Sequence, residues 1–411
     1  MLPDKNDLAN STKSSMIKEF TLKQASSGMI AWLFGVTGPL LIVLQAAEQA
    51  NLDQTTIISW IFAIYVVGGT LSVGLSIYYR QPIAVAFSIP GAILVGTALS
   101  HHSFSDIIGV YLITGIVILL FGLSGIVDKM MSFIPMPIVM GMVSGVLLPF
   151  GLNILVSLTD DFFLNGIILL SFLIFSMFPV ISRYFPPILG ALLLAFLLII
   201  FFGFMEWKPS EKLIAVPSIY MPTFSWAAIA ELVIPLTVTV IAIQNAQGIS
   251  IMKASGYKPP INTMTNWSGI GSLVNGIFGA HSACIAGPMT AILTSDQSDK
   301  KGKHYTASIV MGILWIGFGL FAPVMIGLIQ GIPSSVVYLL GGLAMLGVLS
   351  SSLRSTFSGS FQMGALFSFL ITLSDVTILG IGSPFWGMVG GVLISAMVEK
   401  ADFKKKSQPA V

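Results

Sequence analysis

Three amide side chains lie close together in a stretch of sequence that is otherwise apolar. Gln244, Asn245 and Gln247 fall near the end of residues 224–250, in which Glu231 is the only charged residue. An amide among apolar side chains is costly unless it forms hydrogen bonds. Such groups either bond to a neighbouring helix or bind a polar ligand, and both interpretations are open. We predict that Gln244 and Asn245 contact a ligand.

Two other stretches combine an extended-looking segment with a proline that starts a short apolar run. Residues 82–88 precede Ile89-Pro90-Gly91, and residues 282–286 precede Gly287-Pro288. Proline is favoured in the first turn of a helix, where its missing N–H would have no partner. Each stretch therefore predicts a half-helix that begins inside a bilayer, where non-helical backbone is tolerated only if it is buried or lines a cavity.

The starts of two facing half-helices offer free N–H groups and positive dipole ends, which bind anions without a buried Lys or Arg. The structural alternative is a kinked helix with no ligand in each place. The ligand-contact residues predicted here are Phe87, Ser88, Ile89, Gly287 and Thr290, and the predicted hinge residues are Pro90, Gly91 and Pro288.

Few side chains in the apolar stretches can carry a proton. His281 is interpreted equally as a ligand or proton contact and as a polar cap. Glu231 precedes Gln244 by thirteen residues, about 20 Å along a helix axis, so we expect it near the outer surface. These two are the candidates for proton coupling. Cys284 is interpreted as a small buried residue without reactivity.

The sequence shows no pattern typical of an enzyme. Four scattered His and a single Cys form no nucleophile–base pair and no metal-ligand motif, and a phosphate-binding G-x-x-x-x-G-K-[ST] run is missing. No catalytic residue, metal or cofactor is predicted.

The composition indicates an integral membrane protein. Apolar residues make up 55% of the 411 residues, charged residues only 9%, and the mean hydropathy is +0.93. The net charge of +2 gives no reason to expect nucleic-acid binding. Residues 1–25 are a charged polar tail without the features of a cleaved signal peptide.

Uncharged runs between the charges predict fourteen membrane spans. Long runs at 259–295 and 304–353 each divide into two, at Gly279-Ala280-His281 and at Gly331-Ile332-Pro333. The predicted organisation is an N-terminal tail (1–25), seven spans (26–205), an external loop (206–223), seven more spans (224–400) and a C-terminal tail (401–411). With both termini cytoplasmic, 17 of the 19 Lys and Arg residues fall inside, as the positive-inside rule requires of an inner-membrane protein.

The two sets of seven spans are predicted to be an inverted repeat. An offset of 198 residues places Pro90 on Pro288, Pro135 on Pro333 and Pro186 on Pro384. Prolines that merely mark helix ends are the alternative explanation. An odd number of spans per copy means that the second copy is inserted upside down. The predicted fold class is all-α and polytopic, with extended stretches and half-helices in segments three and ten.

Several motifs resemble those of the benzoate-proton symporter (BenE-type) family, over most of the chain. They are Gln45-Ala46-Ala47, the run from Gln244 to Ile249, Met252-Lys253-Ala254-Ser255-Gly256-Tyr257, Gly279-Ala280-His281, and the run from Gly380 to Gly387. One position departs: the family usually carries an Asn shortly after the segment-ten His, where this chain has Cys284.

The resemblance implies the fold of the uracil permease and sulfate permease superfamily. Its core domain holds segments one to four and eight to eleven, its gate domain holds the rest, and the substrate binds between the half-helices and segment eight. The implied function is proton-coupled symport of benzoate or a similar aromatic carboxylate. A nucleobase permease or another small organic anion permease is the alternative, although nucleobase relatives carry acids where this chain has Gln244. An ion channel is a weaker alternative because no ring of charges is visible. The oligomeric state is left open, with a homodimer among the options.

Overall fold

The computed structural model describes residues 20–36, 38–125, 127, 135–178, 187–204, 212–294, 303–374, 376, 378 and 383–406. The first half contains α2 (Leu22–Val36), α3 (Gly38–Gln49), α4 (Gln54–Tyr79), β1 (Val85–Phe87), α5 (Ile89–Ala98), α6 (Phe104–Ser124), α8 (Met136–Asp160), α9 (Phe162–Met177) and α11 (Pro187–Phe201). The second half contains α12 (Trp226–Val238), a π-helix η1 (Thr239–Asn245), α13 (Ala246–Ala254), α14 (Ile261–Ile277), β2 (Ala283–Ile285), α15 (Gly287–Leu293), α16 (His304–Leu320), α17 (Ala322–Gln330), α18 (Ser334–Thr356), α19 (Gln362–Leu373), α20 (Ser383–Val398) and α21 (Lys400–Lys406).

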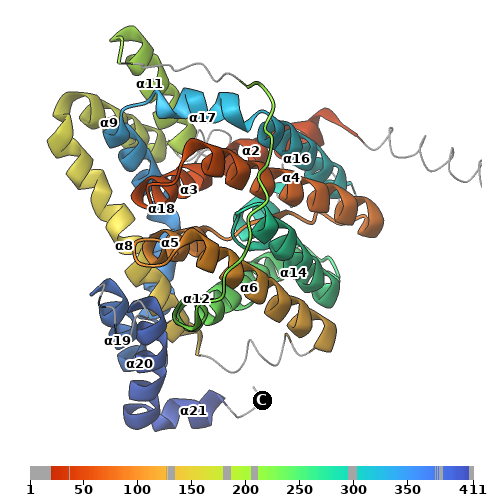
Figure 1. Ribbon diagram of the computed structural model, residues 1–411, viewed down its shortest axis with the longest axis vertical. Helices are drawn as coiled ribbons and strands as arrows, with labels where there is room; N and C mark the ends of the chain where they lie inside the picture. Colours follow the sequence, from red (N-terminus) through yellow and green to blue (C-terminus); the bar gives the residue numbers. More distant parts are fainter. Residues whose placement is uncertain are drawn as a thin grey trace, which may run out of the picture.

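The helix packing has an approximate two-fold symmetry. When each helix is exchanged for its counterpart in the other half, one packing pair becomes another. In the core, α6 packs on α14 and α4 on α16, while α2 packs on α16 and α12 on α6. At the ends of the molecule, α9 packs on α11 and α19 on α20, and α8 packs on α18 between them. Figure 1 shows these two end pairs far apart, with the core helices grouped on one side. This two-fold pattern agrees with the predicted repeat.

The two strands join the repeats at the centre of the fold. β1 and β2 are antiparallel, with Val85 opposite Ile285, Ala86 opposite Cys284 and Phe87 opposite Ala283. All six residues are buried. α5 and α15 begin directly after these strands and are too short to cross a bilayer, at about 15 Å and 10 Å. The predicted extended stretches and half-helices are therefore present.

Each outer strand edge is bonded by the second helix of its own repeat. On the β1 side, Ser72 Oγ of α4 accepts a hydrogen bond from Val85 N at 2.9 Å. On the β2 side, Ser272 Oγ of α14 accepts one from Ala283 N at 3.0 Å. Buried backbone N–H groups need such partners where water is excluded. The same short side chain meets this need at equivalent places in both halves.

The segment between the halves crosses the ends of four core helices. Ala215 N donates to Leu320 O of α16, Tyr220 N to Ile277 O of α14 and Thr223 N to Ser105 O of α6, while Ser218 N donates to Ser59 Oγ of α4. Figure 1 shows it as a green trace in front of these helices. The positive-inside rule predicts that all four helix ends lie on the same side of the membrane.

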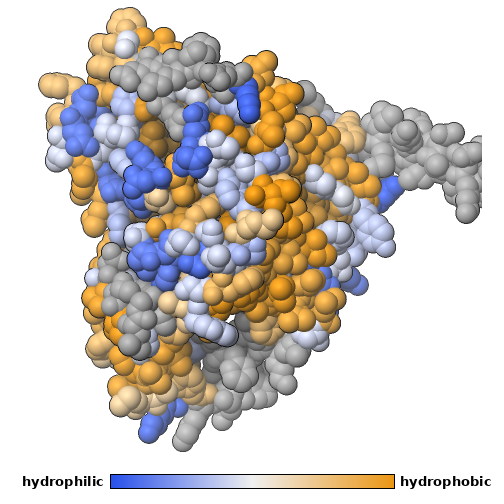
Figure 2. Space-filling view, in the orientation of Figure 1, coloured by the Kyte–Doolittle hydropathy of each residue, from blue (hydrophilic) through white to orange (hydrophobic). Residues whose placement is uncertain are grey.

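The surface of the structure suits a lipid environment. Among the described residues, five helices are long and apolar enough to cross a membrane, or up to seven if two bent pairs each count as one span. Large apolar side chains such as Phe163, Phe201 and Trp226 are exposed, and hydrophobic residues cover broad areas in Figure 2. The count of fourteen spans stays a prediction.

The run 304–353 contains more breaks than its sequence predicts. Besides the predicted break at residues 331–333, the chain bends by 77° between α16 and α17, and by 43° within α18. Parts of the predicted tails and of the 206–223 loop lie outside the described residues, as do Pro186 and the family motif residues 380–382.

Glycines set the close approach of the paired core helices. A Cβ on Gly69 of α4 would lie 2.5 Å from Gly312 O of α16, and a Cβ on Gly312 would lie 2.7 Å from Gly69 O. In the related pair, a Cβ on Gly269 of α14 would lie 2.7 Å from Leu119 N of α6. Membrane helices commonly associate through such small residues because their backbones can then pack closely.

We therefore expect Gly69→Leu to force α4 and α16 apart and to destabilise the protein by about 1–3 kcal/mol, the usual cost of overpacking. Gly74→Leu is the matched control, because Gly74 lies on the same helix and a Cβ added there would meet no described atom within 4 Å. The measurement is the melting temperature of purified protein in detergent. Equal melting temperatures for the two variants would show that this contact does not set the helix spacing.

Candidate functional site

A cavity of about 370 Å³ lies between the half-helices and the helices α8 and α18. Its size is within the range usual for small-molecule sites. The lining consists of Phe34, Pro39, Ala86, Phe87, Ile89, Pro90, Met136, Met140, Val143, Ala242, Ile243, Gln244, Ala246, Gln247, Ala286, Pro288, Met289, Ser351 and Ser355. This described lining is mostly apolar and contains no charged residue. An aromatic or aliphatic body fits such walls, and the few polar groups can orient it.

The amide of Gln244 is available in this cavity. Gln244 lies in η1 and is largely buried, and within the described part of the chain its side chain has no hydrogen-bond partner. Gln247, one turn further along, is exposed, and its side chain packs over Gly287. A Cβ added to Gly287 would lie 2.5 Å from Gln247 Oε1. π-helical turns are rare in proteins, and those that occur are often found at functional sites. The nearest sign of such irregularity in the sequence is Pro235, inside α12.

Asn245 has a different place from the one predicted. It is fully buried and does not line the cavity. Its Oδ1 accepts a hydrogen bond from Ile285 N at 2.7 Å, and its Nδ2 donates to Ser268 Oγ at 3.3 Å. Asn245 therefore bonds the edge of β2 that does not pair with β1, and it holds that strand against η1.

The two half-helices differ at their first residue. Ser88 caps α5, because its Oγ accepts a hydrogen bond from Gly91 N at 3.1 Å. The residue at the equivalent place, 198 positions later, is Ala286, and α15 has no side-chain cap. Pro288 lacks an N–H, so Gly287 and Met289 carry the N–H groups of this first turn. The start of α15 therefore has no side chain that competes with a ligand for these N–H groups.

The remaining predicted residues around the half-helices divide into those that line the cavity and those that do not. Ser88, Gly91, Gly287 and Thr290 do not line the cavity, and Thr290 Oγ1 donates to Ala286 O at 2.7 Å within its own helix. Phe87, Ile89, Pro90 and Pro288 do line it. The Phe87 ring also meets the Tyr65 ring edge-on, with centroids 5.5 Å apart.

His281 lies behind the cavity wall. Its Nδ1 accepts a hydrogen bond from Trp60 Nε1 at 2.8 Å, which places the ring proton on Nε2, and Nε2 then donates to Ser88 O at 2.9 Å. Both nitrogens of a neutral, fully buried ring are used. This arrangement connects the start of β2 to the cap of α5, and nothing in the sequence pointed to Trp60 as its partner.

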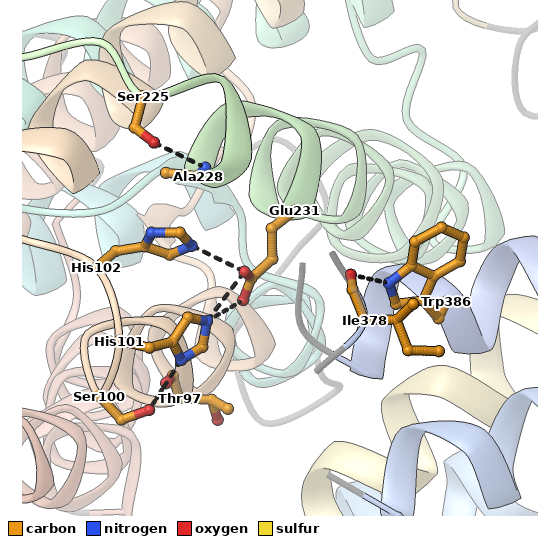
Figure 3. A network of polar contacts seen from close by, with 9 residues as sticks. All are labelled: Thr97, Ser100, His101, His102, Ser225, Ala228, Glu231, Ile378 and Trp386. Carbon is orange, nitrogen blue, oxygen red and sulfur yellow. Dashed lines mark hydrogen bonds and ion pairs between the residues drawn. The ribbon is translucent and has the colours of Figure 1, made fainter. Parts of the chain in front are cut away.

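Glu231 lies away from the cavity, in α12. Its carboxylate contacts His101 and His102, which follow α5 (Figure 3). Its side chain is 3% exposed. Neither proton-coupling candidate lines the cavity.

Repeated half-helices, uncharged cavity walls and a bundle with an apolar surface define a secondary transporter rather than an enzyme. The comparisons identify the family. Residues 18–397 match the BenE family, described as "Benzoate membrane transport protein". The chain belongs to this family of membrane transport proteins.

Two relatives support this assignment, and two solved structures share the fold. The chain is 32% identical to the "Benzoate membrane transport protein" of Acinetobacter baylyi, over 92% of this chain and 95% of the relative. It is also 32% identical to "Inner membrane protein YdcO" of Escherichia coli, over 89% and 93%. The transmembrane domain of a cyanobacterial bicarbonate transporter, BicA, shares the fold with a TM-score of 0.61 at 14% identity, covering 90% of this chain and 97% of that one. Murine Slc26a9, an anion transporter in an inward-facing state, matches with a TM-score of 0.64 at 12% identity, covering 98% of this chain and 73% of that one.

The two neighbouring amides should respond differently to substitution. Asn245→Ala leaves the buried N–H of Ile285 without a partner, so we expect a loss of about 1–3 kcal/mol in stability. Gln244→Ala breaks no hydrogen bond of the described chain and should leave the melting temperature almost unchanged. Thermal unfolding of the two purified variants in detergent measures the difference. Equal losses would contradict the separate roles that the geometry gives them.

Proposed function

We propose that this transporter carries benzoate or a closely similar aromatic carboxylate together with a proton. The observation that carries the proposal is the uncharged cavity at the start of α15, with the available amide of Gln244 beside it. The carboxylate would accept hydrogen bonds from the Gln244 amide and from Met289 N–H, aided by the helix dipole. The ring would lie among Phe87, Met136 and Met140. The family and the name of the Acinetobacter relative support this substrate class.

The alternative of a nucleobase or another small organic anion is less favoured by the lining. A nucleobase presents several N–H donors, which acidic side chains bind well, whereas this cavity offers amides, hydroxyls and apolar walls. An ion channel would need a continuous polar path, and the described cavity is a site of limited volume.

The transport mechanism proposed is alternating access. A second cavity, of about 880 Å³, is lined by residues of α3, α4, α18 and neighbouring loops, including Glu48 and Asn51. α3 and α18 line both cavities, at different heights: Pro39 and Ser351 face the first, Leu44 and Val337 the second. Between the cavities these helices meet closely, and Gln45 Nε2 donates to Val337 O at 3.1 Å. A shift of the core against α18 would open one side as it closes the other.

The orientation proposed is an inner-membrane protein with both termini cytoplasmic. The first cavity ends near Ser355, beside Arg354, and the positive-inside rule places this end in the cytoplasm. In this orientation the first cavity would lie toward the cytoplasm and the second toward the outside. The packing pairs described above support a proposed division into a core of segments one to four and eight to eleven and a gate of the others. A homodimer is part of the proposal, to be checked by the mass of the purified complex.

Replacing Gln244 with Ala should weaken benzoate binding by roughly tenfold to a hundredfold, because a hydrogen bond to a charged group contributes about 1.5–3 kcal/mol. Saturable uptake of labelled benzoate by vesicles should fall accordingly. Gln362→Ala is the matched control, since Gln362 is exposed at the start of α19 and does not line the cavity. Normal uptake kinetics in Gln244→Ala would place the substrate elsewhere.

Uptake should depend on the proton gradient. The described cavity lining holds no fixed positive charge, so moving a carboxylate inward against the membrane potential would cost about 2.3 kcal/mol per 100 mV. One accompanying proton removes this cost. We expect uptake to rise with an inward proton gradient, to collapse with a protonophore and to change little with voltage alone. Benzamide should compete poorly, since it lacks the charge. A sodium gradient that replaces the proton gradient, or equal competition by benzamide, would contradict the proposal and leave the fold unaffected.

A further inference from the structure

Two histidines and a buried glutamate come together at the end of α5 that lies away from the cavity. His101 Nε2 is 3.0 Å from Glu231 Oε2, and His102 Nε2 is 2.9 Å from the same oxygen. One ligand atom from each of the three residues lies within 4.8 Å of the others. Figure 3 shows the two imidazoles converging on the carboxylate from the loop after α5, while Glu231 reaches them from α12.

The distances suit a small divalent cation. A tetrahedral Zn²⁺ holds His nitrogen and carboxylate oxygen at about 2.0–2.2 Å, which places neighbouring ligand atoms about 3.3 Å apart. Small side-chain movements would therefore bring the three atoms to a common centre. Two imidazoles with one carboxylate form a ligand set that Zn²⁺ and related transition metals use, whereas Mg²⁺ and Ca²⁺ prefer oxygen ligands.

The site is built into the protein rather than formed by chance on its surface. The Glu231 side chain is 3% exposed and His102 is 8% exposed, while His101, at 28%, leaves a path from solvent. Ser100 Oγ lies 3.0 Å from His101 Nδ1, an outer contact that orients the ring and leaves Nε2 for a ligand. A buried carboxylate needs a positive partner. In the described part of the chain, the ion-pair partners of Glu231 are these two imidazoles.

We propose that His101, His102 and Glu231 bind a divalent transition metal ion of the Zn²⁺ class. The ion ties the outer end of α5 to α12. Since the other end of α5 lines the cavity at Ile89 and Pro90 and η1 continues from α12, the ion fixes two walls of the cavity relative to one another. In this role Glu231 holds a metal and does not carry the transported proton. The proposal is independent of the substrate, because none of its ligands lines the cavity.

Co²⁺ added to metal-free purified protein in detergent tests this directly, since its visible absorption reports nitrogen and oxygen ligands in a tetrahedral or five-coordinate site. We expect one Co²⁺ per chain, displaced by Zn²⁺ and not by Mg²⁺, and a rise in melting temperature with Zn²⁺. His102→Ala and Glu231→Gln should each weaken Zn²⁺ binding by at least about tenfold.

Asp106→Asn is the matched control. It removes a carboxylate from the same end of the core, but Asp106 is already bonded to Ser103 and Thr223, at 2.7 Å each. This variant should bind Co²⁺ as the unaltered protein does. Because Glu231→Gln alone could destabilise the fold, each variant is first compared by its elution on size exclusion. A featureless Co²⁺ spectrum in the unaltered protein, or Glu231→Gln binding with unchanged affinity, would overturn the proposal.

Discussion

The pairing of β1 with β2 is the interaction on which the rest of the structure depends. Extended backbone at bilayer depth exposes N–H and C=O groups that no water can satisfy. The strands bond to one another, and their outer edges bond to Ser72, Ser272 and Asn245. Once these groups are satisfied, a half-helix can begin after each strand, and both helix starts point to one place. The substrate cavity is located where it is because the chain stops being helical there.

Small departures from symmetry give this place its chemistry. The repeat places Ser88 and Ala286 at equivalent positions, and only the serine can cap its helix. One N–H of α5 is thereby taken by its own side chain, whereas α15 has no side-chain cap. The neighbouring amides divide in the same way: Asn245 bonds β2, and Gln244 stays available at the cavity wall. Structural and ligand-binding roles are thus assigned to adjacent residues that look alike in the sequence.

The sequence predicted the fold further than it predicted the site. Charge spacing and the 198-residue offset were sufficient for the repeat, because membrane spans are set by length and apolarity alone. Of the site residues predicted in the strands and half-helices, half line the cavity in the structure, Phe87 and Pro288 among them. Ser351 and Met140 were missed, since they come from helices that reach the cavity only through tertiary packing. The contact of Glu231 with His102 was missed for the same reason, as 129 residues separate them.

The strand pair also limits what half of this protein could be. In a chain with only the first seven segments, β1 would have an unbonded edge in the membrane, since its partner strand comes from the second half. That edge could be satisfied only by another copy inserted in the opposite orientation, because the pairing is antiparallel and each half has an odd number of predicted segments. A single-repeat ancestor would thus have been a dual-topology dimer. In one continuous chain the two equivalent positions can carry different residues, as Ser88 and Ala286 do.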